Sequence, residues 1–308
     1  MTDGSRKAVI AALLANLGIA IAKFVGFLIT SSAGLLAEAV HSVADSGNQA
    51  LLLLGGHRAR KAADTEHPFG YGRERYFWAF VVALVLFSMG GLFALYEGIS
   101  KLRHPHEVEN LWVAIGILAF AIVLETISLR TAYREAKRRK PGPVSWWRWI
   151  RSAKEPELPV VLLEDTGAEL GLFLALTGVL LAHFTDEPRW DALGSIAIGA
   201  LLVLIAILLA VEMKGLLIGE AASTQDVTRI TSTLEGAPSV RRLIHLKTQH
   251  LGPDELLVGA KLEFAPDLSV EELSEAIDGA EKALRDAVPI ARVVYLEPDV
   301  YHPAPSGS

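Results

Sequence analysis

The chain has 308 residues, of which 51% are hydrophobic, and its formal net charge at pH 7 is -6. This slightly acidic balance argues against a nucleic-acid partner, because nucleic-acid-binding proteins present clustered positive charge. The sequence contains no cysteine, which excludes disulfides and thiolate ligands, so any metal ion has to be bound by nitrogen or oxygen. A mean hydropathy of +0.36, with long apolar runs, indicates a membrane protein.

Six apolar segments are long enough to cross the hydrocarbon core of a bilayer, which takes about 20 helical residues. They are residues 8–29, 35–56, 76–99, 111–131, 160–184 and 192–211. Backbone polar groups in lipid have to be satisfied within each segment, so we expect all six to be transmembrane helices in a domain of residues 1–215. The first segment begins like a signal peptide, but its length and its Asn16 and Lys23 favour a retained span.

Lysine and arginine gather in the connections on one side of the predicted bundle, which places both termini in the cytoplasm. Residues 132–159 are expected to form a basic, tryptophan-rich cytoplasmic loop. Its composition fits a positively charged inner loop with an aromatic belt, or a segment that lies among anionic headgroups. The richness in Ala, Leu, Gly and Arg favours a bacterial plasma membrane.

The composition changes after residue 215, and residues 216–300 predict a small cytoplasmic domain. An amphipathic helix over 225–234 precedes two strands, 242–250 and 255–264. A capping box from Ser269 to Glu272 opens a further helix, and 291–297 is a last strand. The order αββαβ indicates a ferredoxin-like α+β fold, followed by a tail over 301–308.

The second predicted span carries polar side chains that a helix surrounded by lipid does not need. Glu38, His41, Asp45 and Asn48 recur at the spacing of one helix face. His41 and Asp45 lie four residues apart, so they can bind one ion from a single helix. An imidazole with a carboxylate suits zinc and its first-row neighbours, and a tetrahedral site needs further ligands.

The fifth predicted span is the second source of ligands, because it contains Glu164, Asp165 and Glu169. Asp165 and Glu169 share a helix face, whereas Glu164 points about 100° away from Asp165. Ionisable side chains in a span are costly and mark ion pathways. A pairing of an acid with Lys23 or Arg130 for structure alone is the alternative. Asn16 can line the same cavity or join helices.

Four segments of the sequence resemble the cation diffusion facilitator family of metal–proton antiporters. They are SSAGLLAEAVHSVAD at 31–45, HPFGYGRERYFW at 67–78, YEGI at 96–99 and WDALGSIAIG at 190–199. The resemblance covers nearly the whole chain. It implies a six-helix protomer in the lipid bilayer, a homodimer, and export of divalent metal ions driven by inward proton flow. It also implies a secondary transporter rather than an enzyme, without a prosthetic group.

The same resemblance implies a metal site between the second and fifth helices. His41 and Asp45 match the second-helix ligands, and Asp165 matches the fifth-helix aspartate. The usual fifth-helix histidine falls at Val161, so that ligand is missing. Glu38 is expected beside the ligands rather than on the metal ion.

The stretch LEDTGAELG at 163–171 resembles the branch of the family that includes the zinc transporter nine type. Glu164 or Glu169 then supplies the fourth ligand. Zinc is the leading cargo, although three oxygens and one nitrogen can favour manganese, iron or cobalt. A metal channel without proton coupling, and a membrane-anchored sensor or scaffold, remain alternatives.

Two peripheral sites follow from the resemblance. Asp64 and His67 match a second metal site after the second span, but its other histidine falls at Tyr71, and a solvated loop is the alternative.

In the small domain, His245 matches one ligand of a family zinc site and Glu297 can replace another. Lys261 and Tyr295 hold positions where other members carry histidine. We therefore expect this site of the small domain to be incomplete.

Overall fold

The computed structural model describes residues 3–31, 33–105 and 110–302, and the chain divides into two compact units. The helical unit holds Met1–Arg58 and Glu74–Lys214, and the small domain holds Ala59–Arg73 and Gly215–Ser308.

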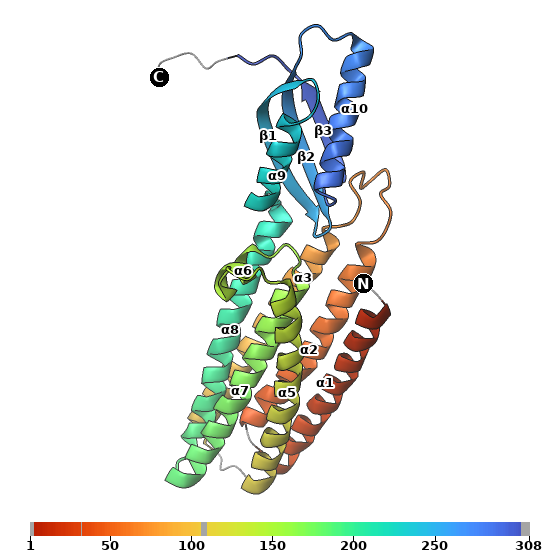
Figure 1. Ribbon diagram of the computed structural model, residues 1–308. Helices are drawn as coiled ribbons and strands as arrows, with labels where there is room; N and C mark the ends of the chain where they lie inside the picture. The colour runs from red at the N-terminus through yellow and green to blue at the C-terminus, as the bar shows by residue number, and fades with distance from the viewer. Residues whose placement is uncertain (1–2, 32, 106–109, 303–308) are drawn as a thin grey trace, which may run out of the picture. The chain divides into compact units, whose positions relative to one another are not determined.

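The helical unit is built from long helices that run side by side (Figure 1). A π-helical segment, η1, joins α3 to α4 in one continuous rod. The elements are α1 (Asp3–Thr30), α2 (Ala33–Arg58), α3 (Glu74–Val85), η1 (Leu86–Leu92), α4 (Phe93–Arg103), α5 (Leu111–Arg139), α6 (Trp146–Ser152), α7 (Glu157–Thr185) and α8 (Arg189–Ile218).

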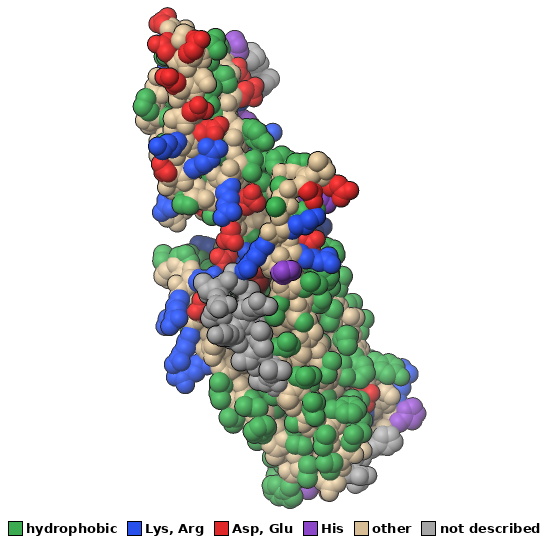
Figure 2. All heavy atoms as spheres, turned by 90° about the vertical axis from the view of Figure 1, so that its right-hand side faces the viewer, with side chains coloured by type: hydrophobic (Ala, Val, Ile, Leu, Met, Phe, Trp, Pro, Cys, Tyr) green, Lys and Arg blue, Asp and Glu red, His purple; other side chains and the backbone are tan. Residues whose placement is uncertain are grey.

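Four of these rods are long and apolar enough to cross a membrane. They are Glu74–Arg103, Leu111–Arg139, Glu157–Thr185 and Arg189–Ile218, and Asn16–Thr30 of α1 is a shorter apolar helix. Figure 2 shows hydrophobic side chains over the flank of the helical unit and charged side chains toward its ends. A helical transmembrane domain with four apolar helices is thus confirmed, whereas the count of six spans stays a prediction.

Residues 132–159 are more ordered than the loop that the sequence suggests. The helix α5 continues to Arg139, and α6 begins after Ser145, whose Oγ accepts the backbone N–H of Arg148 at 3.3 Å. The side chain of Trp149 is buried in a small core with Ala136 of α5 and Leu162 of α7. Aromatic burial therefore folds this connection against two helix ends.

The small domain has the predicted order αββαβ. It consists of α9 (Thr224–Glu235), β1 (Val240–Gly252), β2 (Glu255–Phe264), α10 (Val270–Ala287) and β3 (Val293–Pro298). The strand order is β1-β2-β3, with β1 antiparallel and β3 parallel to β2. Both helices contribute to one core beside the sheet (Figure 1).

Alternation along β2 builds this core, because Leu256, Val258 and Leu262 are fully buried on one face. They pack in one cluster with Ile230 of α9 and Leu284 of α10. The predicted capping box is present at the start of α10.

The boundary between the units differs from the sequence prediction, which assigned everything before residue 216 to the membrane domain. The connection Ala59–Arg73 belongs to the small domain. The reason is a close backbone approach: a Cβ on Gly72 would lie 2.8 Å from the carbonyl oxygen of Leu251. Only glycine at this position permits that contact.

Candidate metal site in the helical unit

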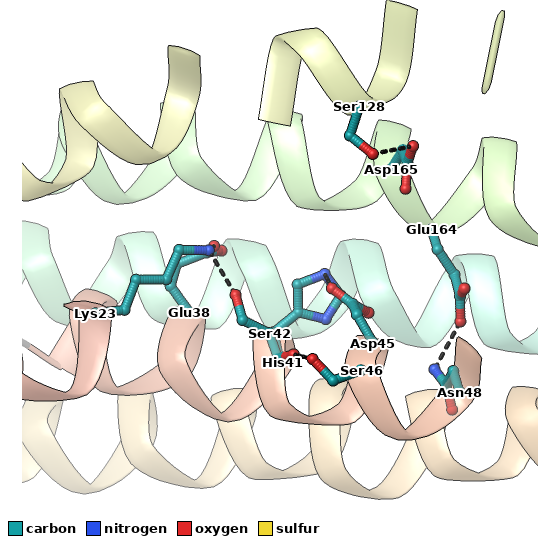
Figure 3. Close-up of polar contacts among 10 residues, drawn as sticks. All are labelled: Lys23, Glu38, His41, Ser42, Asp45, Ser46, Asn48, Ser128, Glu164 and Asp165. Carbon is teal, nitrogen blue, oxygen red and sulfur yellow. Dashed lines mark hydrogen bonds and ion pairs between the residues drawn. The ribbon is translucent and has the colours of Figure 1, made fainter. Parts of the chain in front are cut away.

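The polar face of α2 points into the protein rather than toward lipid. Glu38, His41 and Asn48 are fully buried, and the side chain of Asp45 is 13% exposed. His41 and Asp45 lie side by side on this helix, with Nε2 3.4 Å from Oδ2 (Figure 3). The helical spacing of four residues therefore produces the pair that the sequence predicts.

Part of this pair has no bonding partner. Within the described part of the chain, His41 Nδ1 and Asp45 Oδ1 are buried and make no hydrogen bond. Buried polar atoms in proteins nearly always have partners, and an exception calls for an explanation. Imidazole nitrogen and carboxylate oxygen are the donor types that zinc takes in the absence of cysteine.

The carboxylates of α7 divide between two neighbouring helices. Glu164 Oε1 accepts a hydrogen bond from Asn48 Nδ2 of α2 at 2.6 Å. Asp165 Oδ2 accepts one from Ser128 Oγ of α5 at 3.1 Å, as Figure 3 shows. Glu164 is thus directed toward the helix that carries His41.

Glu169 Oε1 accepts a hydrogen bond from Thr126 Oγ1 of α5 at 2.8 Å. Asp165 and Glu169 therefore face the same helix, as their spacing predicts.

The structure does not bring the predicted ligands around one point. Across residues 3–31, 33–105 and 110–302, no three His, Asp or Glu side chains form a group that could hold a metal ion. The pair on α2 and the carboxylates on α7 instead have separate partners. Binding of one ion by both helices would require these side chains to exchange their hydrogen bonds.

Two polar residues of α5 that the sequence analysis did not single out contact the acids of α7: Ser128 bonds Asp165 and Thr126 bonds Glu169. Serine and threonine also occur in transmembrane helices without any functional role, so the sequence alone did not identify Thr126 and Ser128 as residues of the site. Glu125, on the same helix, is also buried, with 7% exposure. A carboxylate in a predicted span is the sequence feature that could have marked this helix as part of the site.

Glu38 is held by a lysine. Its Oε2 lies 3.1 Å from Lys23 Nζ of α1, which also donates a hydrogen bond to Ser42 Oγ at 2.8 Å. This contact corresponds to the ion pair weighed as the structural alternative. Asn16 of α1 is half-buried, and its lining of the cavity stays a prediction.

The candidate site after the second span is a closed turn. Asp64 Oδ2 accepts hydrogen bonds from Lys61 Nζ at 2.8 Å and from the Tyr71 hydroxyl at 2.7 Å, and Oδ1 accepts the backbone N–H of His67 at 2.9 Å. The bonds from Lys61 and Tyr71 hold the pKa of Asp64 well below its usual range. The lysine ammonium already neutralises the carboxylate that would bind a metal ion.

The candidate site of the small domain also contains a lysine. Lys261 Nζ lies 3.0 Å from both Glu297 Oε1 and Asp299 Oδ2, and His245 on β1 is opposite Lys261 in the sheet register. The hydrogen bond from Lys261 lowers the pKa of Asp299. These contacts support the expectation that the zinc site is incomplete.

Both units match models of one family. Residues 9–218 match the cation efflux transmembrane domain, and residues 222–299 match the cytoplasmic domain of cation efflux proteins. The chain belongs to the cation efflux family. The resemblance to the cation diffusion facilitators is thereby confirmed, and membership agrees with a transporter rather than an enzyme.

Relatives of this cation efflux protein come from several kingdoms. The human protein named "Proton-coupled zinc antiporter SLC30A9, mitochondrial" is 33% identical over 85% of this chain and 46% of its own length. "Metal tolerance protein C4" of Arabidopsis thaliana is 31% identical over 87% of this chain and 59% of its own length. "Magnetosome protein MamM" of Paramagnetospirillum magneticum is 23% identical over 83% of this chain and 77% of its own length. The chain spans about half the length of the first two.

The predicted location in a bacterial plasma membrane has to be corrected. Relatives at 31–34% identity come from animals and a plant, and those from animals are named as mitochondrial. They indicate an integral membrane protein in a eukaryotic setting. The earlier expectation rested on amino-acid composition, which reflects base composition of a genome and carries no physical information about the membrane.

Proposed function

We propose that this cation efflux protein exports a divalent metal ion, with zinc as the leading cargo, in exchange for protons. The observation that carries the proposal is the buried pair of His41 and Asp45 on α2, in which both ring nitrogens and Asp45 Oδ1 make no hydrogen bond in the described structure. The printed name of the human relative, a proton-coupled zinc antiporter, agrees with this cargo.

The cargo binds to His41, Asp45, Asp165 and Glu164. We choose Glu164 over Glu169 because Asn48, its hydrogen-bond donor, lies on α2 with the first two ligands. Glu169 is instead bonded to Thr126 of α5. One imidazole and three carboxylates can complete a tetrahedral site.

Binding requires that the carboxylates of α7 exchange their present partners for the metal ion. Glu164 gives up the amide of Asn48, and Asp165 gives up the hydroxyl of Ser128. Both donors are uncharged, so the exchange breaks hydrogen bonds to neutral groups rather than ion pairs. These weak partners keep the carboxylates in place between transport cycles.

Proton coupling follows from the same atoms. A metal ion binds deprotonated imidazole and carboxylate, so metal and protons compete for His41 and the carboxylates. Metal binding on the side of low proton concentration and protonation on the opposite side then produce exchange. A separate proton site is not needed.

We also infer the finer architecture. The helices α1 and α2 complete six spans together with the four apolar rods. The homodimer that the family resemblance implies includes the cytoplasmic domain at 222–299.

Proteoliposomes with an imposed pH step test the function, with zinc, manganese, iron and cobalt uptake measured in parallel. We expect proton-driven uptake of zinc, lost in Asp45→Ala and in Asp165→Ala. Glu187→Ala is the matched control, because Glu187 pairs only loosely with Arg189, at 3.7 Å, and its side chain is 47% exposed at a helix connection. Flux that ignores the pH step would favour a channel, and absence of flux for every metal would refute transport.

A further inference from the structure

A fully buried ion pair lies beside the proposed metal ligands. The side chains of Lys23 on α1 and Glu38 on α2 are 1% and 0% exposed, and Nζ lies 3.1 Å from Oε2. Removing two charges from water is costly, and apolar side chains of similar size often replace such a pair without loss of stability. Its presence in a membrane-spanning region therefore calls for a reason other than stability.

The position of the ammonium group suggests that reason. Lys23 Nζ donates a second hydrogen bond to Ser42 Oγ at 2.8 Å, and Ser42 is the neighbour of His41 in the chain. Glu38 precedes His41 by three residues, a rise of about 4.5 Å along the helix. Figure 3 shows Lys23 and its two partners in line with His41 and Asp45.

The second oxygen of Glu38 is directed at the helix that carries the other ligands. Within the described residues, Oε1 is buried without a hydrogen-bond partner, and a Cβ on Gly171 of α7 would lie 2.5 Å from it. Glycine at this position leaves room for the carboxylate between α2 and α7. The charge of Glu38 therefore lies at the interface that contains the proposed site.

We propose that Lys23 and Glu38 set the affinity for the cargo as a pair of opposed fixed charges, a proposal that rests on the proposed transport function. Glu38 attracts a divalent cation at His41 and Asp45, and Lys23 repels it. A transported ion has to bind tightly enough to enter and weakly enough to leave. The balanced pair keeps the affinity within that range.

The proposal predicts opposite effects for the two charges. Lys23→Met leaves the carboxylate unopposed, so KM for zinc falls and release becomes slower, which lowers the maximal rate. Glu38→Gln leaves the ammonium unopposed, so KM rises. A dication and a unit charge separated by about 10 Å interact strongly enough, even at an effective dielectric constant near 20, for changes of about tenfold or more.

A pair that only joined α1 to α2 would behave differently, because either substitution would break the same contact. Both single variants would then lose stability and shift KM in the same direction or leave it unchanged. The double variant Lys23→Met/Glu38→Gln restores electrical balance, and we expect its KM within about threefold of the wild type. Lys23→Arg keeps the charge and should retain transport.

The chain contains a matched control in a second buried pair. Lys101 Nζ of α4 lies 2.9 Å from Asp191 Oδ2 of α8, with side chains 4% and 0% exposed. Lys101→Met and Asp191→Asn remove the same chemical groups outside the polar face of α2. We expect them to lower thermal stability without opposite shifts in KM.

The experiment is zinc uptake into proteoliposomes by the wild type, Asp45→Ala and these variants, each checked for a monodisperse profile in detergent. Opposite KM shifts for Lys23→Met and Glu38→Gln support the proposal. Shifts in one direction, or unchanged KM in folded variants, overturn it.

Two further outcomes are decided by additional measurements. If neither single variant folds, Ser42→Ala removes the hydrogen bond that holds the Lys23 ammonium beside His41, while both charges are kept. The repulsion of the cation then weakens and we expect KM to fall, so an unchanged KM overturns the proposal. If the wild type transports no zinc, the transport function fails. Equilibrium zinc titration of the same variants in detergent then tests the opposed charges separately, with opposite shifts in Kd as the supporting result and equal ones as the refutation.

Discussion

Asn48 on α2 donates a hydrogen bond of 2.6 Å to Glu164 on α7, across 116 positions of sequence. This contact joins the helix that carries the imidazole to the helix that carries most of the candidate carboxylates. It distinguishes Glu164 from Glu169, whose described hydrogen bond is to α5.

Glu164→Gln and Glu169→Gln form a matched pair for the fourth ligand. We expect Glu164→Gln to reduce zinc uptake by about tenfold or more, because an amide is a poor zinc ligand, and Glu169→Gln to stay within about twofold of the wild type. Initial uptake rates in proteoliposomes measure both. The reverse ranking would identify Glu169 as the ligand and remove the role assigned to Asn48.

His41→Ala should abolish pH-coupled transport while the protein remains folded. The substitution removes the only nitrogen ligand of the proposed set and leaves α2 with a strong helix former. Uptake is measured with and without a pH step, and circular dichroism in detergent serves as the folding control. Transport that keeps its dependence on the pH step in this variant would show that His41 is not part of the exchange.

The turn at Asp64 should lose order in acid. Hydrogen bonds from Lys61 and Tyr71 depress the pKa of Asp64 in the folded chain. A carboxyl group whose pKa is depressed by folding contributes stability at pH values above its pKa in the unfolded chain, about 3.9. This contribution is lost as the pH falls through the pKa of the group in the folded chain. Hydrogen exchange at the His67 amide should therefore accelerate only well below pH 4.

The matched variant for this turn is Lys61→Met, which removes the first cause of the depressed pKa. Acceleration of exchange in this variant should begin at a higher pH than in the wild type. Identical pH profiles for the two proteins would argue that Lys61 does not hold the turn.

Lys261→His should add a zinc site to the small domain. The substitution releases Glu297 and Asp299 from their ammonium partner and places an imidazole opposite His245 in the sheet. Zinc retained by the purified protein should rise by about one equivalent per protomer, as measured by elemental analysis.

Lys261→Gln is the control for this gain, because it removes the charge without adding a ligand. An equal gain of zinc in Lys261→Gln would mean that the acids bind zinc without His245. No gain in either variant would mean that the acidic pair does not form a metal site.

The sequence by itself determined most of the elements of this protein, whereas α6 lies in a segment expected to be a loop. Apolar length predicted the rods, the capping box at Ser269 predicted the start of α10, and the run 255–264 predicted β2. The spacing of His41 and Asp45 predicted their contact as well. These signals are local, because the spacing of side chains along one helix or strand follows from its own geometry.

Only the tertiary structure decided which polar groups meet. The order Glu164, Asp165, Glu169 does not state that the first contacts Asn48 of α2 and the second Ser128 of α5. Nor does it state that Lys23, 15 positions before Glu38, lies against it. The rotation of a helix about its axis depends on packing against its neighbours, and residues distant in the chain determine that packing.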